Sequence, residues 1–358
     1  MRKMKKNLVI KNLLIWSSVF ILLLALAGCG GNPPQPEGDI NGTDENGEGQ
    51  DAIDETNGDG EEQAAAGTKI INIGVLRGPT GMGAVKLMDN EKYNITLLGS
   101  PDDLVGKIIT GELDLAAVPT NFAPILYQRT GGEIKLVALH TLGILYILEN
   151  GTEIETIGDL AGKTLHISGR GSIPDYVIQY LLKEHGLVPG EDVILDFSAQ
   201  HADLAAMMTA GQRDLALLPQ PYVTSVLMQN EDVRIALDLT QEWRSALNSE
   251  LPMGVLIGQK DFIVNNNSAL KAFLADYEES IRFVNTNVEE AAELIAEYQI
   301  LPNAQIAARA IPFCNIVYFD AQDSKESLDN FFKILYDLNP ESIGGTVPDD
   351  EFYYVPAP

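Results

Sequence analysis

Short apolar runs alternate with amphipathic stretches through most of the chain, and this alternation is typical of α/β proteins. Runs of β-branched and aliphatic residues predict strands at residues 70–76, 94–98, 115–118, 136–139, 164–168, 193–197, 215–218 and 234–237. The segments between them have helical patterns, so we expect βαβ units around parallel sheets. Because residues 68–358 approach the size at which a single core stops growing, we predict two lobes.

An internal repeat supports the prediction of two lobes. Residues 103–119 (DLVGKIITGELDLAAVP) align without gaps on residues 203–219 (DLAAMMTAGQRDLALLP), and seven of the seventeen positions are identical. Each copy predicts a helix, a glycine at the helix C-terminus, an aspartate in the turn and a buried strand that ends at a proline. The alternative is that two unrelated segments share this common α/β solution.

Two equivalent lobes would place the loops after the repeated strands on opposite sides of one cleft, because open α/β sheets bind ligands outside the carboxyl ends of their strands. These loops carry Thr120 and Asn121 in the first copy, and Gln220 and Tyr222 in the second. His140 stands at the end of another strand of the first lobe. We predict that all five residues contact a ligand.

Two loops that contain glycine precede helices at matching places in the two lobes. Candidate ligand contacts in residues 77–83 (RGPTGMG) and 168–172 (SGRGS) are Arg77, Pro79, Thr80, Met82, Ser168, Arg170 and Ser172. Free N–H groups at a helix N-terminus bind an anion or a polar head group, and glycines let the backbone approach it closely. Neither loop has the GxxxxGK[ST] or GxGxxG spacing of nucleotide-binding loops.

The two arginines of these loops are candidates for a charge-assisted hydrogen bond to a solute. We favour a buried Arg170 as an anion contact, because it lies between two glycines just before a helix, whereas Arg77 turns more easily to solvent. The alternative is ordinary turn chemistry, with Thr80 and Ser172 as helix N-caps and both arginines solvated.

The first 28 residues predict a lipoprotein signal peptide. Residues 1–12 carry five basic and no acidic residues, and residues 13–27 form an uncharged run that is too short for a full membrane span. The run ends in Leu-Ala-Gly-Cys, which resembles the bacterial lipobox. We therefore predict cleavage before Cys29 and lipidation of its thiol, and the alternative is an ordinary transmembrane anchor with a chance cysteine.

Residues 29–67 are predicted to be the lipidated cysteine and a disordered tether. Residues 30–67 hold nine glycines and eleven acidic residues but no aromatic or basic residue, and such a composition cannot bury enough apolar surface to fold. Cys314 is the only other cysteine and lies in an apolar stretch. We expect no intramolecular disulfide and a buried Cys314 thiol.

Charge and the catalytic inventory exclude several functions. The formal net charge of the chain is −27, which argues against nucleic acid as a partner. The four histidines show no HExxH spacing and no pairing with cysteine that suggests zinc, and no GxSxG motif occurs. We predict a protein that is not an enzyme, with no catalytic residues, no metal and no cofactor.

From about residue 69 to residue 354 the chain resembles the periplasmic-binding-protein family of the nitrate, sulfonate and bicarbonate type, which is related to thiamine-pyrimidine binding proteins. The residues that carry this resemblance are INIGVLRGPTGMGA, the two G-x-x-D-L-A-x-x-P segments and IGDLAGKTLHISGRGSIPDY. The last stretch is similar to the phrase "dLkGKtig" that opens the second lobe in the family.

The resemblance implies a type II periplasmic-binding-protein fold, in which two α/β lobes close like a venus flytrap. Two crossing strands would join the lobes, and we place them at residues 144–149 and 253–257. Lobe one would then comprise residues 68–150 and 251–358, and lobe two residues 151–250.

The resemblance also implies a function outside the cytoplasm, at the outer face of the cell membrane. A monomeric binding protein would capture a small solute between its lobes and deliver it to an ABC permease and its ATPase. The implied solutes are small organic anions of the sulfonate or carboxylate type and heteroaromatic vitamin precursors. The alternatives are a ligand-sensing or adhesive surface lipoprotein without a transporter, and an enzyme on the same fold, although the cysteine-rich segment of the related pyrimidine synthases is absent.

The C-terminal part is predicted to be helical and to complete lobe one. Apolar spacing predicts helices at residues 268–286, 289–298, 303–310 and 324–337. The chain then ends in an aromatic group, Phe352, Tyr353 and Tyr354. We interpret these three residues as a clasp on the surface of the domain rather than a binding cage.

Overall fold

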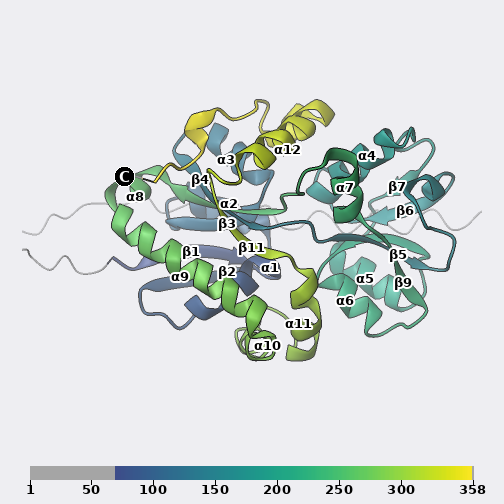
Figure 1. Cartoon of the computed structure of the whole chain (residues 1–358), viewed down its shortest axis with the longest axis horizontal. Helices are drawn as coiled ribbons and strands as arrows, with labels where there is room; N and C mark the ends of the chain where they lie inside the picture. The colour runs from purple at the N-terminus through teal and green to yellow at the C-terminus, as the bar shows by residue number, and fades with distance from the viewer. Residues whose placement is uncertain (1–68, 357–358) are drawn as a thin grey trace, which may run out of the picture. The chain divides into compact units, whose positions relative to one another are not determined.

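Two sheets organise the part of the chain that the computed structural model describes, residues 69–356 (Figure 1). The six-stranded sheet has the order β11 (Ile316–Asp320), β4 (Ile134–Thr141), β10 (Gly254–Gln259), β3 (Leu115–Pro119), β1 (Ile71–Leu76), β2 (Tyr93–Leu98). The five-stranded sheet has the order β7 (Ile194–Asp196), β6 (Thr164–Ile167), β8 (Leu215–Pro219), β5 (Leu145–Asn150), β9 (Val233–Asp238). The predicted signal peptide, Cys29 and the tether lie outside the described residues.

The two sheets are built in the same way, apart from the additional edge strand β11. In the first sheet β10 lies antiparallel between β3 and β4, and in the second β5 lies antiparallel between β8 and β9. The strands of the sequence repeat, β3 and β8, therefore occupy equivalent positions. Gly111 and Gly211, which follow the two repeat helices, both adopt a positive φ (76° and 65°), as a glycine after a helix C-terminus is expected to do.

The chain passes between the sheets twice. Residues 142–144 connect β4 of the first sheet to β5 of the second, and residues 251–253 lead back into β10. The predicted crossing strands are thus confirmed as β5 and β10, each of which becomes a central strand of the sheet that it enters. The predicted lobe boundaries at residues 150 and 251 stay a prediction, because contacts group Gln63–Pro358 into one compact unit.

Helices cover both sheets, and most of them agree with the sequence pattern. They are α1 (Pro79–Gly83), α2 (Pro101–Ile109), α3 (Phe122–Arg129), α4 (Ile173–Glu184), α5 (His201–Thr209), α6 (Tyr222–Leu227), α7 (Leu239–Leu247), α8 (Lys260–Asn265), α9 (Asn267–Thr286), α10 (Val288–Glu297), α11 (Ala304–Ala310) and α12 (Lys325–Leu338). The predicted C-terminal helices correspond to α9–α12. Strand β11 was not predicted, because its apolar residues continue the apolar stretch around Cys314.

Apolar residues pack on both faces of the second sheet. Along β5, Leu145 and Ile147 join the main core, which extends through both sheets. The alternate residues Tyr146 and Leu148 face α5 and α6 in a smaller second cluster. This alternation follows from the two-residue period of a strand, and it explains why the sequence of β5 is apolar throughout.

The predicted aromatic clasp and the buried thiol are both confirmed. Phe352, Tyr353 and Tyr354 are buried, and the backbone N–H of Tyr354 donates to the carbonyl of Leu136 in β4 at 2.8 Å. Cys314 is fully buried, and burial raises the pKa of its thiol well above the usual range. No helix among residues 69–356 is long and apolar enough to cross a membrane.

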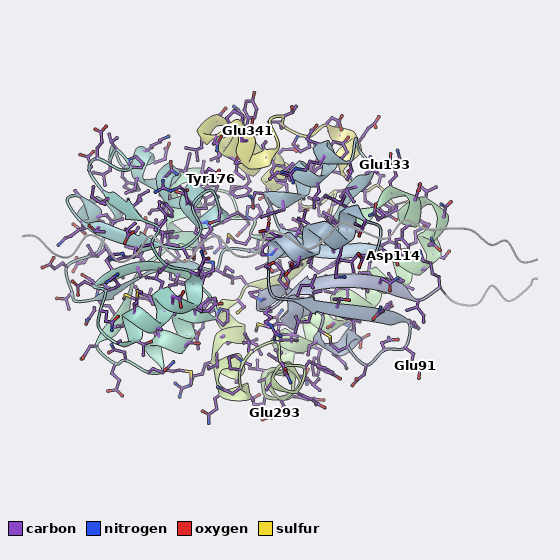
Figure 2. All side chains as sticks on the ribbon, turned by 180° about the vertical axis from the view of Figure 1, so that it is seen from behind. Glu91, Asp114, Glu133, Tyr176, Glu293 and Glu341 are labelled. Atoms are coloured by element: carbon purple, nitrogen blue, oxygen red, sulfur yellow. The ribbon has the colours of Figure 1, made fainter. Side chains whose placement is uncertain are left out.

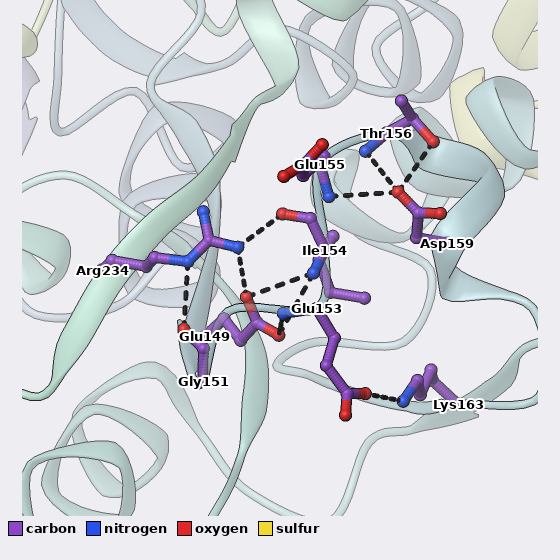
Figure 3. A network of polar contacts seen from close by, with 9 residues as sticks. All are labelled: Glu149, Gly151, Glu153, Ile154, Glu155, Thr156, Asp159, Lys163 and Arg234. Carbon is purple, nitrogen blue, oxygen red and sulfur yellow. Dashed lines mark hydrogen bonds and ion pairs between the residues drawn. The ribbon is translucent and has the colours of Figure 1, made fainter.

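An ion pair between the buried Glu149 and the partly exposed Arg234 fixes the turn that follows β5 (Figure 3). Arg234 of β9 donates to the carboxylate of Glu149 at 2.5 Å and to the carbonyls of Gly151 and Ile154. The same carboxylate accepts from the N–H groups of Glu153 and Ile154. Glu149 is 5% exposed, so its charge is balanced almost entirely by these partners.

We predict that Arg234→Ala lowers the free energy of unfolding by about 2–4 kcal/mol, because it leaves a buried carboxylate without its cation. Urea unfolding measures this. The control is Arg244→Ala, since Arg244 pairs with Glu250 where both side chains are largely exposed (49% and 42%). That change should cost less than about 1 kcal/mol. Equal losses in the two variants would contradict a special role for Glu149.

Candidate functional site

The loops after β3 and β8 are anchored by the same hydrogen bond in each lobe. The N–H of Thr120 donates to the carbonyl of Met253 at 3.2 Å, and the N–H of Gln220 donates to that of Ile144 at 2.9 Å. Each bond ties a loop to one of the two crossing segments. The equivalence predicted from the repeat thus extends from the strands into the candidate site.

The side chains of these two loops are buried but differ in their partners. The Gln220 side-chain oxygen accepts from the N–H and hydroxyl groups of Thr224, at 3.2 and 2.8 Å. Asn121 is only 3% exposed, and its side chain makes no capping hydrogen bond to α3. The Thr120 hydroxyl is buried without a partner. Such groups hydrogen-bond readily to a ligand.

Loops from the two lobes approach each other at this place. A methyl group built on Gly78, in the loop after β1, would lie 3.9 Å from the ring of Pro221, in the loop after β8. The structure therefore brings together the two kinds of loop that the sequence predicted to face one cleft. Gly78 adopts a φ of 97°, which residues with a side chain rarely do.

The first glycine loop uses most of its polar groups internally. The Thr80 hydroxyl donates to the carbonyl of Leu76 at 2.7 Å and accepts from its N–H group at 2.9 Å. Gly78, not Thr80, is the N-cap of α1, where Pro79 occupies the first turn. Met82 is completely buried in the core of lobe one.

The expectation of a buried arginine is wrong, because both candidate arginines are exposed. Arg77 donates to the backbone carbonyl of Gln299, and the guanidinium of Arg170 lies 4.1 Å from the ring centroid of Phe197. Burying a guanidinium without a carboxylate partner is costly, whereas an aromatic face at the surface stabilises it without desolvation. Ser172 is the N-cap of α4, and its hydroxyl bonds to the carbonyl of Gly169.

Ser168 and Tyr222 meet at His201, a residue that sequence reasoning did not place in the site. The Ser168 hydroxyl and His201 Nδ1 are hydrogen-bonded. The rings of His201 and Tyr222 are stacked, with centroids 5.5 Å apart and planes 30° apart. Burial lowers the pKa of His201 to about 4, so the ring is neutral at pH 7. Its place at the start of α5, beside the cleft loops, was the one signal available.

His140 is buried between β10 and α9. Its Nδ1 lies 2.8 Å from the Thr141 hydroxyl, and its Nε2 has no hydrogen-bond partner. The ring centroid is 6.3 Å from that of Tyr277 in α9, whose hydroxyl is also without a partner. Burial lowers the pKa of His140 to about 4, so this ring is neutral as well.

The chemistry of the site is therefore hydrogen bonding by neutral groups. No cluster of histidine, cysteine or acidic residues that could hold a metal occurs among residues 69–356. A groove of about 290 Å³ lies between α7 and α12. A second groove, of about 340 Å³, lies between α5 and α6 and is bordered by Tyr222 of the candidate site. Of the acidic residues labelled in Figure 2, Glu91, Glu133, Glu293 and Glu341 are exposed, whereas Asp114 is partly buried and pairs with Lys69.

A family model and several solved structures are similar to this chain. Residues 136–291 match the family model described as NMT1/THI5 like. An ABC transporter structure from Parabacteroides distasonis has a TM-score of 0.69 and 23% identity, over 80% of this chain and 99% of that one. This chain has the fold of the periplasmic binding proteins. The resemblance seen in its sequence is thereby confirmed.

Other proteins of this fold are similar at lower identity. The periplasmic aliphatic sulphonate binding protein SsuA from Escherichia coli has a TM-score of 0.63 and 19% identity, over 80% of this chain and 92% of that one. The nitrate-binding protein NrtA from Synechocystis PCC 6803 has a TM-score of 0.51 and 16% identity, over 71% and 74%. No curated protein matches the chain. At these identities the likeness shows the fold alone.

The neutral histidines His140 and His201 predict a loss of stability in mild acid. The unfolded chain binds a proton near pH 6.5, whereas His140 and His201 in the folded protein do so near pH 4. Between these values the unfolded state holds more protons, so stability is complete above about pH 6.5 and falls as the pH drops towards 4. We expect a loss of about 2 kcal/mol per histidine between pH 7 and pH 5.

Urea unfolding of the wild type and of His201→Gln at both pH values measures this. The variant should lose about 2 kcal/mol less than the wild type over the same interval, because one of the two buried imidazoles is gone. Acidic residues contribute equally to both proteins and cancel in the comparison. An identical pH dependence in wild type and variant would show that His201 is not held neutral.

Proposed function

We propose that this chain is the extracytoplasmic solute-binding protein of an ABC importer. It is a monomer, anchored to the outer face of the cell membrane through a lipid on Cys29. It binds a small solute between its lobes and delivers it to a permease and its ATPase. The solute belongs to one of two classes, small organic anions of the sulfonate or carboxylate type, or heteroaromatic vitamin precursors.

One observation carries this proposal: buried polar side chains without partners gather where the strands of the two sheets end. Thr120 follows β3, His140 is the last residue but one of β4, and Thr240 lies at the start of α7, just after β9. Each has a buried polar atom with no hydrogen bond. A buried group left unpaired costs about 1–3 kcal/mol. A solute that reaches these groups from between the lobes would remove that cost, which favours binding.

The competing proposal of an enzyme has less support. The hydrogen-bonded Ser168 and His201 resemble a serine nucleophile and its histidine base. Among the described residues, however, no carboxylate contacts His201 to orient and stabilise a protonated ring. With its pKa lowered to about 4, His201 is also a weak base. The pair is better suited to hydrogen-bond a solute than to activate a hydroxyl group.

We predict that Asn121→Ala weakens solute binding about tenfold while leaving stability nearly unchanged, because the Asn121 side chain makes no capping hydrogen bond to α3 that the variant would lose. Native mass spectrometry of the full-length protein identifies the solute that it retains on purification. Calorimetric titration of that solute then compares wild type and variant. Asn330→Ala is the matched control, since Asn330 is an exposed asparagine on α12.

The same solute should close the two lobes and lower the radius of gyration in small-angle scattering. A protein that retains no solute, or whose radius does not change at saturation, would count against a hinged receptor. Wild-type affinity in Asn121→Ala would remove the loop after β3 from the site. It would leave the importer function to be tested through Gln220 and Tyr222.

We predict that Cys29→Ser releases the protein from the membrane or leaves its signal peptide uncleaved, because the lipid is attached to this thiol. Membrane fractionation and the intact mass of the protein measure both effects. Cys314→Ser is the control, since a buried thiol in the domain has no part in anchoring. A Cys29→Ser protein that is still processed and still carries diacylglycerol would refute the anchoring proposal.

A further inference from the structure

Four unpartnered polar atoms border the two segments that cross between the lobes. They are the hydroxyls of Thr120, Thr240 and Tyr277 and the Nε2 of His140. The fifth such atom in the described residues belongs to Arg213, on the turn before β8. Buried polar groups in folded proteins nearly always have partners, so a cluster of exceptions calls for a ligand that reaches them.

Three of the four groups are linked through the second crossing segment. Met253 accepts a hydrogen bond from the N–H of Thr120 and donates one to the carbonyl of Thr141. A methyl group built on the next residue, Gly254, would lie 2.6 Å from the ring of His140. The His140 ring in turn faces that of Tyr277. These side chains therefore lie around the beginning of β10.

Thr240 stands at the first crossing segment. A methyl group built on Gly143 would lie 2.1 Å from the Thr240 hydroxyl, so the two residues are in direct contact. Gly143 is three positions after His140 in the chain. Asn315 holds this segment in place, since its side chain donates to the carbonyl of Gly143 and its own carbonyl accepts from the N–H of Leu142.

No positive charge accompanies these groups. Among residues 69–356 no lysine or arginine is buried, and Arg77 and Arg170 are exposed and already engaged. The carboxylate of Asp238 accepts from the N–H of Thr240 at 2.9 Å, so the fixed charge beside that hydroxyl is negative. Removing an anion from water into such surroundings is unfavourable.

We propose that Tyr277 and Thr240, together with Thr120 and His140, hydrogen-bond the solute, and that the part of the solute they enclose is uncharged. This inference rests on the proposed function and selects among its solute classes. Tyr277 and Thr240 were not among the ligand contacts that the sequence predicted. A hydroxyl that has no partner until the solute arrives affects binding but not folding.

Two tyrosines that pack on the same phenylalanine allow the proposed role of Tyr277 to be tested. Tyr93 and Tyr277 both pack on Phe273, with ring centroids 5.4 and 5.6 Å away. The Tyr93 hydroxyl donates to Asp276 at 2.6 Å, whereas the Tyr277 hydroxyl has no partner. Tyr93→Phe should therefore lower the Tm, and Tyr277→Phe should leave it unchanged or raise it.

The first measurement needs no solute. Thermal unfolding of the full-length wild type, Tyr93→Phe and Tyr277→Phe compares the two hydroxyls in matched surroundings. If Tyr277→Phe loses as much Tm as Tyr93→Phe, the Tyr277 hydroxyl has a structural partner and the inference is overturned. That result would leave the proposed importer function untouched, because the function does not depend on Tyr277.

The second measurement uses two pairs of probes with the same shape and different charge, benzamide with benzoate and methanesulfonamide with methanesulfonate. At about 10 mM, a neutral probe bound with a Kd near 1 mM should raise the Tm by on the order of 2–4 °C. Tyr277→Phe should remove most of this shift and Tyr93→Phe should retain it. Neither anion should raise the Tm.

A Tm shift that only the anions produce, and that Arg170→Ala abolishes, would overturn the inference and support an anion-binding importer instead. The absence of any shift with all four probes would overturn it too. The proposed function is judged separately, by whether the purified protein retains a solute. The two proposals can therefore fail independently.

Discussion

The exchange of central strands between the sheets is the constraint on which the rest of the structure depends. β5 follows the last parallel strand of lobe one but completes the sheet of lobe two, and β10 does the reverse. Each lobe therefore needs a segment that enters from the other, and both segments must pass the carboxyl ends of the neighbouring strands. The candidate site forms where they pass, because the loops after β3 and β8 are tied to these segments by backbone hydrogen bonds.

Close packing at the crossings explains the glycines found there. A side chain at Gly143 would collide with Thr240, and one at Gly254 would collide with His140. Glycine at both positions lets the polar side chains lie directly against the backbone. It also leaves few heavy side chains to resist rotation about the crossing segments, as hinge motion in a two-lobed protein requires.

Sequence patterns predicted the architecture well, because the two sheets repeat the same arrangement of helices and strands. The seven identities between residues 103–119 and 203–219 mark the same helix and strand in the two sheets, and apolar runs located most strands. The contacts of individual side chains could not be predicted from these patterns. Whether Arg170 is buried depends on Phe197, which is distant in sequence and lies beside it only in the folded chain. His201 and Tyr277 were missed for the same reason, since the neighbours that define them come from other elements.

Different residues account for the stability of the fold and for the proposed binding of a solute. The charged groups that stabilise it are satisfied within the protein, as in the buried network of Glu149 and Arg234 behind the turn that follows β5. The groups at the crossing segments are neutral and unsatisfied, so they reduce stability. Among the aspartate, glutamate, lysine and arginine side chains of residues 69–356, only Glu149 and Asp175 are buried. The residues that contact the proposed solute could therefore vary, while the exchanged strands and the ion pair of Glu149 and Arg234 preserve the fold.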